Sequence, residues 1–312
     1  MNLDKIFHLK ENNTNVKTEI LAGVTTFMTM AYILAVNPNI LAEAGMDHGA
    51  VFTATALAAF IGTLCMAIFA NYPFALAPGM GLNAYFAYTV VLGMGYTWQV
   101  ALTAVFVEGI VFIVLSLTNV REQIFNAIPM NLKSAVSVGI GLFIAFIGLQ
   151  NAHIVIGGAT LVELFSLDGY NSSTGLEATT SDVGITVLLA IIGVVITGIL
   201  VIKNVKGNIL WGILITWLLG IICQFTGLYV PNPDVSCYSL LPDFSNGLSI
   251  PSLAPIFGKL QFDGIFTLDF AVVVFAFLFV DMFDTIGTLI GVSSKANMLD
   301  EEGKLPQIKG AL

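Results

Sequence analysis

Eight apolar stretches dominate this chain, each close to the ~20 residues with which an α-helix crosses about 30 Å of hydrocarbon. They cover roughly 18–36, 49–70, 74–93, 97–118, 135–150, 184–202, 208–229 and 268–292. Because 57% of the residues are hydrophobic and only 10% are charged, the composition excludes an ordinary water-soluble domain. The sequence predicts an all-α polytopic membrane protein with the lipid bilayer as its solvent.

The lysine and arginine residues gather on one side of these stretches. Ten of the eleven occupy the N-terminus or the loops on the same side, and the exception is Lys259. By the positive-inside rule, the N-terminus is cytoplasmic in a multi-pass protein of the cell membrane. The long loops 151–183 and 230–267 then lie outside. The net charge of −9 reflects this topology, and we expect no nucleic acid partner.

The third stretch contains Pro78, Gly79 and Gly81 within its apolar run. Proline lacks a backbone donor and disfavours helix in the residue before it. We therefore expect a short strand to about Pro78 and then a half-helix from Gly81. The N–H groups at such a helix start make a polar site inside the membrane, where Asn83 would offer its amide. The alternative is a proline kink, with Asn83 bonded between helices.

Two carboxylates stand near the middle of the eighth stretch, at a depth where a charge costs at least ~2.5 kcal/mol on insertion scales. The spacing i, i+3, i+4 and i+7 gives one polar helix face with Asp281, Asp284, Thr285 and Thr288. Such acids suit proton-coupled transport, because a carboxyl group in a dry site can release its proton when hydration changes. The alternative is a pair of acids hydrogen-bonded to neighbouring helices.

A third acid, Glu108, lies in the fourth stretch among apolar helical neighbours. Its partner must come from another helix, so a hydrogen bond between helices and a role in a proton path both stay open. In the first stretch, Asn37 and Pro38 predict the end of the helix. The three cysteines and three histidines show no metal-ligating spacing, so we expect no metal and no cofactor.

Three segments give the chain a resemblance to a known family. Their sequences are TEILAGVTTFMTMAY at 18–32, APGMGLNAYF at 77–86 and DMFDTIGT at 281–288. In this order they resemble the AzgA-type branch of the nucleobase/cation symporter 2 superfamily, which includes relatives of xanthine and uracil permeases. The resemblance covers essentially all 312 residues and implies a fold of fourteen segments in two inverted seven-segment repeats.

The resemblance also implies a division of the chain. It assigns 1–17 to a cytoplasmic N-terminus, 18–118 to core-domain segments one to four, 135–229 to gate-domain segments five to seven, 230–267 to an extracellular loop, 268–292 to core-domain segment eight and 293–312 to a cytoplasmic loop. A segment-ten glutamate should complete the family's site, and we expect this chain to end before segment nine. These residues alone are then expected not to transport.

Members of this family take up a purine nucleobase, either guanine or hypoxanthine and in some cases adenine, together with a proton by alternating access. By resemblance, Asn83 and Asp281 bind the substrate at mid-membrane, with Gly81 and Thr285 beside them. The candidates for proton coupling or support of the site are Asp281, Asp284 and Glu108. The sequence leaves a homodimer open.

Two other interpretations compete with this one. A membrane enzyme of the prenyltransferase type would use the DxxD at 281–284 to hold Mg²⁺ and a diphosphate, and it would need a second acidic motif and nearby cations. The nearest cation in sequence is Lys295, beyond the eighth stretch. An anion carrier of the related sulfate and bicarbonate folds would favour a cation near the half-helix rather than two acids.

Overall fold

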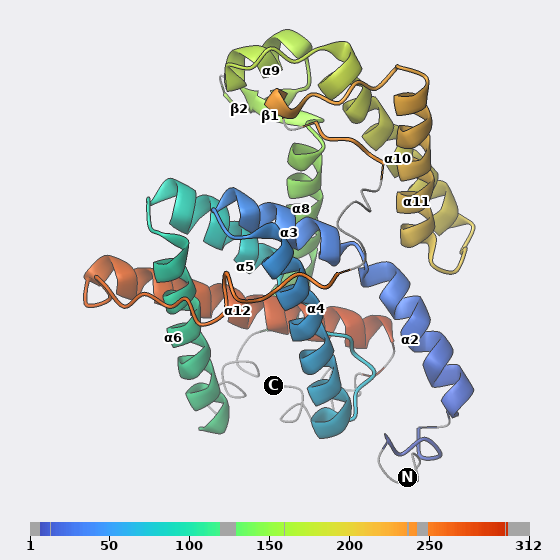
Figure 1. Cartoon of the computed structure of the whole chain (residues 1–312). Coiled ribbons are helices and arrows are strands. Elements are labelled where there is room, and N and C mark those ends of the chain that lie inside the picture. The colour runs from blue at the N-terminus through green and yellow to red at the C-terminus, as the bar shows by residue number, and fades with distance from the viewer. Residues whose placement is uncertain are drawn as a thin grey trace. The chain divides into compact units, whose positions relative to one another are not determined.

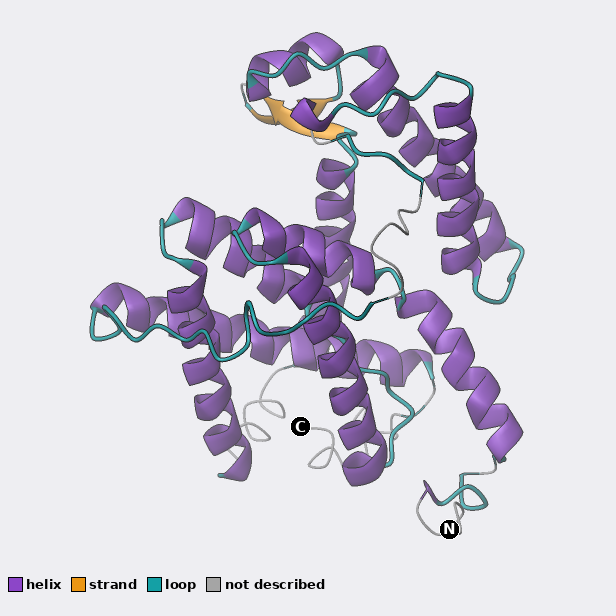
Figure 2. Cartoon of the chain, viewed as in Figure 1, coloured by secondary structure: helices purple, strands orange, loops and turns teal. Residues whose placement is uncertain are grey.

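The computed structural model describes residues 7–12, 14–118, 129–158, 160–235, 237–241, 249–296 and 298. These residues form helices joined by loops, together with a two-stranded hairpin (Figures 1 and 2). Among them, six helical spans are long and apolar enough to cross a membrane: Val16–Glu43, His48–Ala70, Trp98–Leu117, Thr180–Ile202, Asn208–Phe225 and Leu268–Lys295. The predicted all-α polytopic class is confirmed.

The two other expected segments, the fifth and the third, are not among these six spans. The fifth corresponds to α8 (Met130–Asn151), a helix of 22 residues of which several side chains lie outside the described set. The third is broken, as described below.

The chain divides into two compact units. The first contains Met1–Glu19, Tyr32–Ile144 and Ile250–Leu312, and the second contains Ile20–Ala31 and Ala145–Ser249. Every candidate site residue from the sequence belongs to the first unit.

The first unit is built from helices that pack on one another. Its elements are α3 (Ile33–Glu43), α4 (His48–Cys65), η1 (Met66–Ala70), α5 (Met80–Ala84), η2 (Tyr85–Gly93), α6 (Trp98–Leu117) and α12 (Leu268–Lys295). Helix α3 packs against α4 and α5, and α12 packs against α6 and α5 (Figure 1). Phe277 of α12 is fully buried, and its ring meets Tyr85 edge-on at a centroid distance of 5.1 Å.

The first apolar segment contains two helices, because α2 (Val16–Met30) ends before Tyr32 and α3 begins at Ile33. Pro38 is buried inside α3, which continues to Glu43. The prediction that Asn37 and Pro38 end the helix is therefore wrong. Proline removes one backbone donor, and the packing of α3 on α4 maintains the helix around that gap.

The third segment begins with a non-helical stretch, residues 71–79, and becomes helical at Met80 (Figure 2). The expected half-helix is confirmed, with α5 continuing as the π-helix η2 to Gly93. The expected strand is not found, because no neighbouring strand pairs with these described residues. Instead the Thr63 hydroxyl accepts from the Leu76 N–H at 2.9 Å and donates to the Leu76 carbonyl at 3.2 Å.

A segment that runs from 250 to 267 joins three helices of the first unit. The Thr53 hydroxyl on α4 donates to the Pro251 carbonyl at 2.8 Å. The buried Thr103 hydroxyl on α6 donates to the Gln261 carbonyl at 2.8 Å and accepts from the Gln261 N–H at 3.0 Å. Ile256 is buried in the same core, so the segment is fastened to α4 and α6 before α12 begins.

In the second unit, α10 (Ile185–Ile202) and α11 (Asn208–Phe225) lie side by side (Figure 1). Each helix places a glycine against a threonine of the other. A Cβ on Gly193 would collide with Thr216, and a Cβ on Gly212 would collide with Thr197. Each threonine hydroxyl donates to the glycine carbonyl of its own helix at 2.8 Å, so both hydroxyls are satisfied inside the apolar pair.

The second unit also contains a small folded region in the 151–183 loop. Its elements are β1 (Val155–Gly158), β2 (Leu161–Leu164), α9 (Leu167–Thr174) and η3 (Thr180–Gly184), and η4 (Pro233–Val235) follows in the next long loop. The strands pair antiparallel. The His153 ring meets the buried Tyr170 ring edge-on at 5.1 Å. Burial lowers the pKa of His153 below its usual range.

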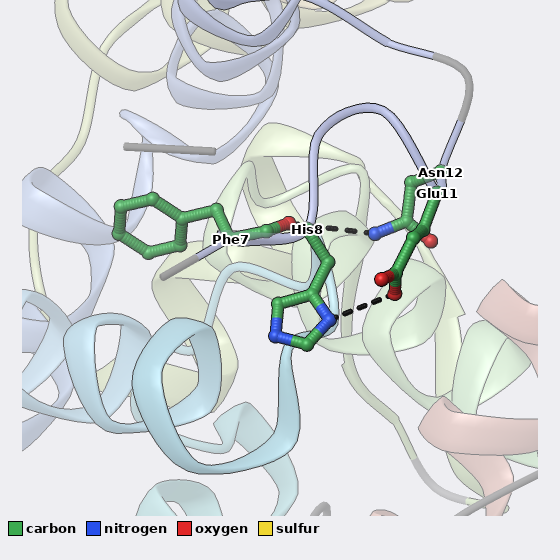
Figure 3. Close-up of polar contacts among 4 residues, drawn as sticks. All are labelled: Phe7, His8, Glu11 and Asn12. Atoms are coloured by element: carbon green, nitrogen blue, oxygen red, sulfur yellow. Dashed lines mark hydrogen bonds and ion pairs between the residues drawn. The ribbon is translucent and has the colours of Figure 1, made fainter. Parts of the chain in front are cut away.

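Ahead of α2, two polar contacts close a short turn (Figure 3). His8 Nδ1 lies 2.9 Å from Glu11 Oε2, and Asn12 Nδ2 donates to the Phe7 carbonyl at 3.5 Å. The two paired side chains are 50% and 79% exposed, so this pair contributes little to stability.

Candidate functional site

The start of the half-helix and the acids of α12 come together in the first unit. A Cβ placed on Gly79, the residue before α5, would lie 2.8 Å from Asp284 Oδ2. Gly79 has a φ of −71°, which any residue can adopt, so the nearby carboxylate and not the backbone conformation is what favours glycine here. The first turn of a helix has N–H groups without intrahelical acceptors, which favour a negative charge nearby. The structure therefore sets Asp284 at a point suited to a carboxylate.

Asn83 lies in the first turn of α5 and is tied to two other helices. Its Nδ2 donates to Asn37 Oδ1 on α3, and Asn37 Nδ2 donates to Thr55 Oγ1 on α4 at 2.7 Å. Asn37 and Thr55 are only 3% and 2% exposed. The interpretation of Asn83 as an amide bonded between helices and its interpretation as a site residue are thus compatible.

Asn37, which accepts a hydrogen bond from Asn83, was not among the site residues predicted from the sequence. Together with Pro38 it was predicted only to end the helix. The available signal was the amide itself, because a buried amide in an apolar segment needs a hydrogen-bond partner.

The remaining residues of the two motifs lie on α5 and α12. Asp281, Asp284 and Thr285 are half-buried along α12, whereas Thr288 is exposed. Gly81 has open space beside it, since a Cβ there would meet only Phe143 Cε1 at 3.9 Å within the described residues. The polar face of α12 is therefore partly buried from Asp281 to Thr285 and exposed at Thr288.

Glu108 is buried in α6, with 6% of its surface exposed. Helix α6 packs against α12, so the third acid belongs to the same helix cluster as the other two. Across the described residues, no group of three or more His, Cys, Asp or Glu side chains is arranged to hold a metal ion.

A model of the Permease family matches residues 17–312. The chain belongs to this permease family. The resemblance to AzgA-type permeases, first indicated by the three motifs, is confirmed by the relatives below.

Three relatives align over almost the whole chain. MJ0326 of Methanocaldococcus jannaschii, whose name gives no substrate, is 50% identical over 99% of this chain and 65% of its own length. The guanine/hypoxanthine permease PbuO of Bacillus subtilis is 45% identical over 98% of the chain and 66% of its own. The adenine permease AdeP of Escherichia coli is 40% identical over 99% of the chain and 63% of its own. The chain thus spans just under two thirds of the length of these permeases.

Proposed function

We propose that the full-length protein containing this chain takes up purine nucleobases across the cell membrane by proton-coupled alternating access. The observation that carries the proposal is the approach of Asp284 to Gly79, which joins the two motifs at the start of the half-helix. The similarity to guanine/hypoxanthine and adenine permeases supplies the substrate class. Family membership also argues against the prenyltransferase interpretation.

The substrate in this proposal binds beside the start of α5. The ring of a nucleobase presents N–H donors and carbonyl or ring-nitrogen acceptors in one plane. The Asp281 carboxylate accepts hydrogen bonds from donors, and Asn83 contributes its amide. Gly81 leaves room next to this amide, and the Thr285 hydroxyl lies one turn after Asp281 on α12.

Proton coupling is assigned to the acids of the same unit. Asp284 lies beside the start of the half-helix, where N–H groups without intrahelical acceptors stabilise a negative charge. A proton on this carboxylate would weaken its attraction to α5, so protonation would be linked to the contact between α5 and α12. Asp281 and Glu108 are the other acids through which the proton could pass, because α6 and α12 pack together.

The first unit corresponds to the core domain (18–118 and 268–292) and the second to the gate domain (135–229) in this proposal. The grouping of α3 to α6 with α12, and of α10 with α11, supports this division. Two ranges differ from this division, because residues 20–31 group with the second unit and residues 135–144 group with the first. The positive-inside pattern supports a cytoplasmic N-terminus, with the 151–183 and 230–267 loops outside.

An anion carrier is disfavoured by the charge at the half-helix. Such a carrier would place a cation near the α5 start, and the side chain found beside Gly79 is a carboxylate.

Uptake of radiolabelled guanine, hypoxanthine and adenine tests the proposal in a host that lacks its own purine permeases. We expect saturable uptake by the full-length protein that a protonophore abolishes. Asp281→Asn should remove it, whereas Asp269→Asn, on the exposed first turn of the same helix, should not. Absence of purine uptake by the abundant wild-type protein, or normal uptake by Asp281→Asn, contradicts the proposal.

A further inference from the structure

The hydrogen bonds that reach Asn83 have a direction. The Thr55 hydroxyl has one proton, and it donates that proton to the Val51 carbonyl at 2.7 Å. Its oxygen can then only accept, so Asn37 presents its NH₂ group to Thr55. The carbonyl oxygen of Asn37 therefore faces Asn83 and accepts from Asn83 Nδ2.

This direction fixes which end of the Asn83 amide is engaged. One N–H of its NH₂ group is donated to Asn37, and its Oδ1 accepts no hydrogen bond from the residues that the structure describes. Reversing the amide of Asn37 alone would set two NH₂ groups against each other. Reversing both amides would require the Thr55 hydroxyl to donate to Asn37, and its hydrogen bond to the Val51 carbonyl would be lost. The observed direction is therefore the more stable one.

We infer that Asn37 and Thr55 are positioning residues that hold the Asn83 amide with its carbonyl oxygen as the acceptor offered to a ligand. Asn83 then meets the nucleobase through Oδ1, which accepts from a ring N–H, because its Nδ2 end is turned toward Asn37 on α3. This inference rests on the proposed function and deepens it, since it states which kind of purine edge meets the half-helix. The near-complete burial of Asn37 and Thr55 keeps water from supplying alternative partners.

The test is a set of coupling measurements in the full-length transporter. Purine analogues that each lack one ring N–H or one acceptor are used to inhibit uptake of radiolabelled hypoxanthine. Losing the matching N–H should weaken inhibition of the wild type about three- to tenfold, the effect of one hydrogen bond. In Asn83→Ala the same analogue should lose less than about twofold. Analogues that lack an acceptor should be penalised equally in both proteins.

If Asn37 and Thr55 position Asn83, substitutions at these two residues should change the same discrimination between analogues. Asn37→Leu should reproduce the loss of N–H discrimination, while Thr55→Ser, which keeps the hydroxyl, should retain it. A purely structural role would instead lower the amount of transporter and its maximal rate without changing discrimination. Thr55→Val replaces Asn37→Leu as the test variant if the latter is absent from the membrane. Thr118→Val is the matched control, because that hydroxyl bonds only within its own segment.

The outcomes separate the two proposals. If the wild type transports no purine, the proposed function fails and this inference fails with it. If the wild type transports purines but Asn83→Ala removes discrimination at an acceptor, the inference is overturned and the function stands. If the test variant at position 37 or 55 keeps the wild-type pattern, the positioning role is overturned.

Discussion

The carboxylate of Asp284 lies so close to Gly79 that a Cβ at position 79 would be only 2.8 Å from its Oδ2. The two residues are 205 positions apart, and their contact joins the start of the half-helix to the middle of α12. Glycine at position 79 leaves room for the carboxylate of Asp284. The N–H groups at the start of the half-helix in turn stabilise a negative charge at this point.

Gly79→Ala should disturb this contact. The added methyl group must displace either the carboxylate or the start of α5, and overpacking of this kind costs about 1 to 3 kcal/mol. We expect purine uptake by the full-length protein to fall at least about fivefold, which corresponds to about 1 kcal/mol. Gly198→Ala is the control, since a Cβ there meets nothing within 4 Å. Uptake at the wild-type rate by Gly79→Ala would show that the contact has no functional weight.

Asp284→Asn should separate binding from coupling. The amide keeps the size of the side chain but cannot carry the charge that the half-helix attracts. We expect exchange of internal and external purine to persist while accumulation against a gradient is lost. Both are measured with radiolabelled hypoxanthine in loaded vesicles. Accumulation that still follows an imposed pH gradient would remove Asp284 from the coupling mechanism.

The close packing of glycine against threonine between α10 and α11 should make both helices sensitive to a larger side chain at the glycine positions. Gly212→Leu should lower stability by about 1 to 3 kcal/mol, because its side chain must enter the space of Thr197. The measurement is thermal unfolding of the purified protein in detergent. Gly198→Leu, which faces open space on α10, should have a smaller effect. Equal effects of the two substitutions would argue against close packing at Gly212.

His153 should make the folded region around Tyr170 sensitive to acid. Burial lowers the pKa of His153, so the folded state favours the neutral ring. As the pH falls through about 6.5, the unfolded chain binds the proton more readily and stability decreases. His153→Phe should flatten this part of the stability profile, measured by thermal unfolding from about pH 8 to about pH 5. A profile that keeps its slope in His153→Phe would show that another group is responsible.

The helices of this protein could be predicted because each depends on a local property. Long apolar runs mark the spans, and Pro78 together with its glycines marks the break, so the half-helix start at Met80 falls one residue from the expected Gly81. The same local logic failed at Pro38, where packing between helices outweighs the lost backbone bond. It also gave no hint of the β1–β2 hairpin, in which β1 contributes Ile156 to the cluster around Tyr170.

The candidate site residues could be proposed from the sequence one by one, but their arrangement could not. A carboxylate inside an apolar span has a high free-energy cost of insertion, so Asp281, Asp284 and Glu108 could be selected from the sequence. Which glycine lies beside Asp284 depends on how two distant segments pack. The direction of the bonds through Asn37 depends on a single hydroxyl proton of Thr55, which no sequence pattern displays.

The segment from 250 to 267 is fastened to α4 through Thr53 and to α6 through Thr103. A fluorophore or spin label attached to an exposed residue of this segment would therefore move with α4 and α6. Such a label would report displacement of these two helices while itself remaining outside the apolar spans. The same attachment means that an antibody seated on the segment would restrain the helices beneath it.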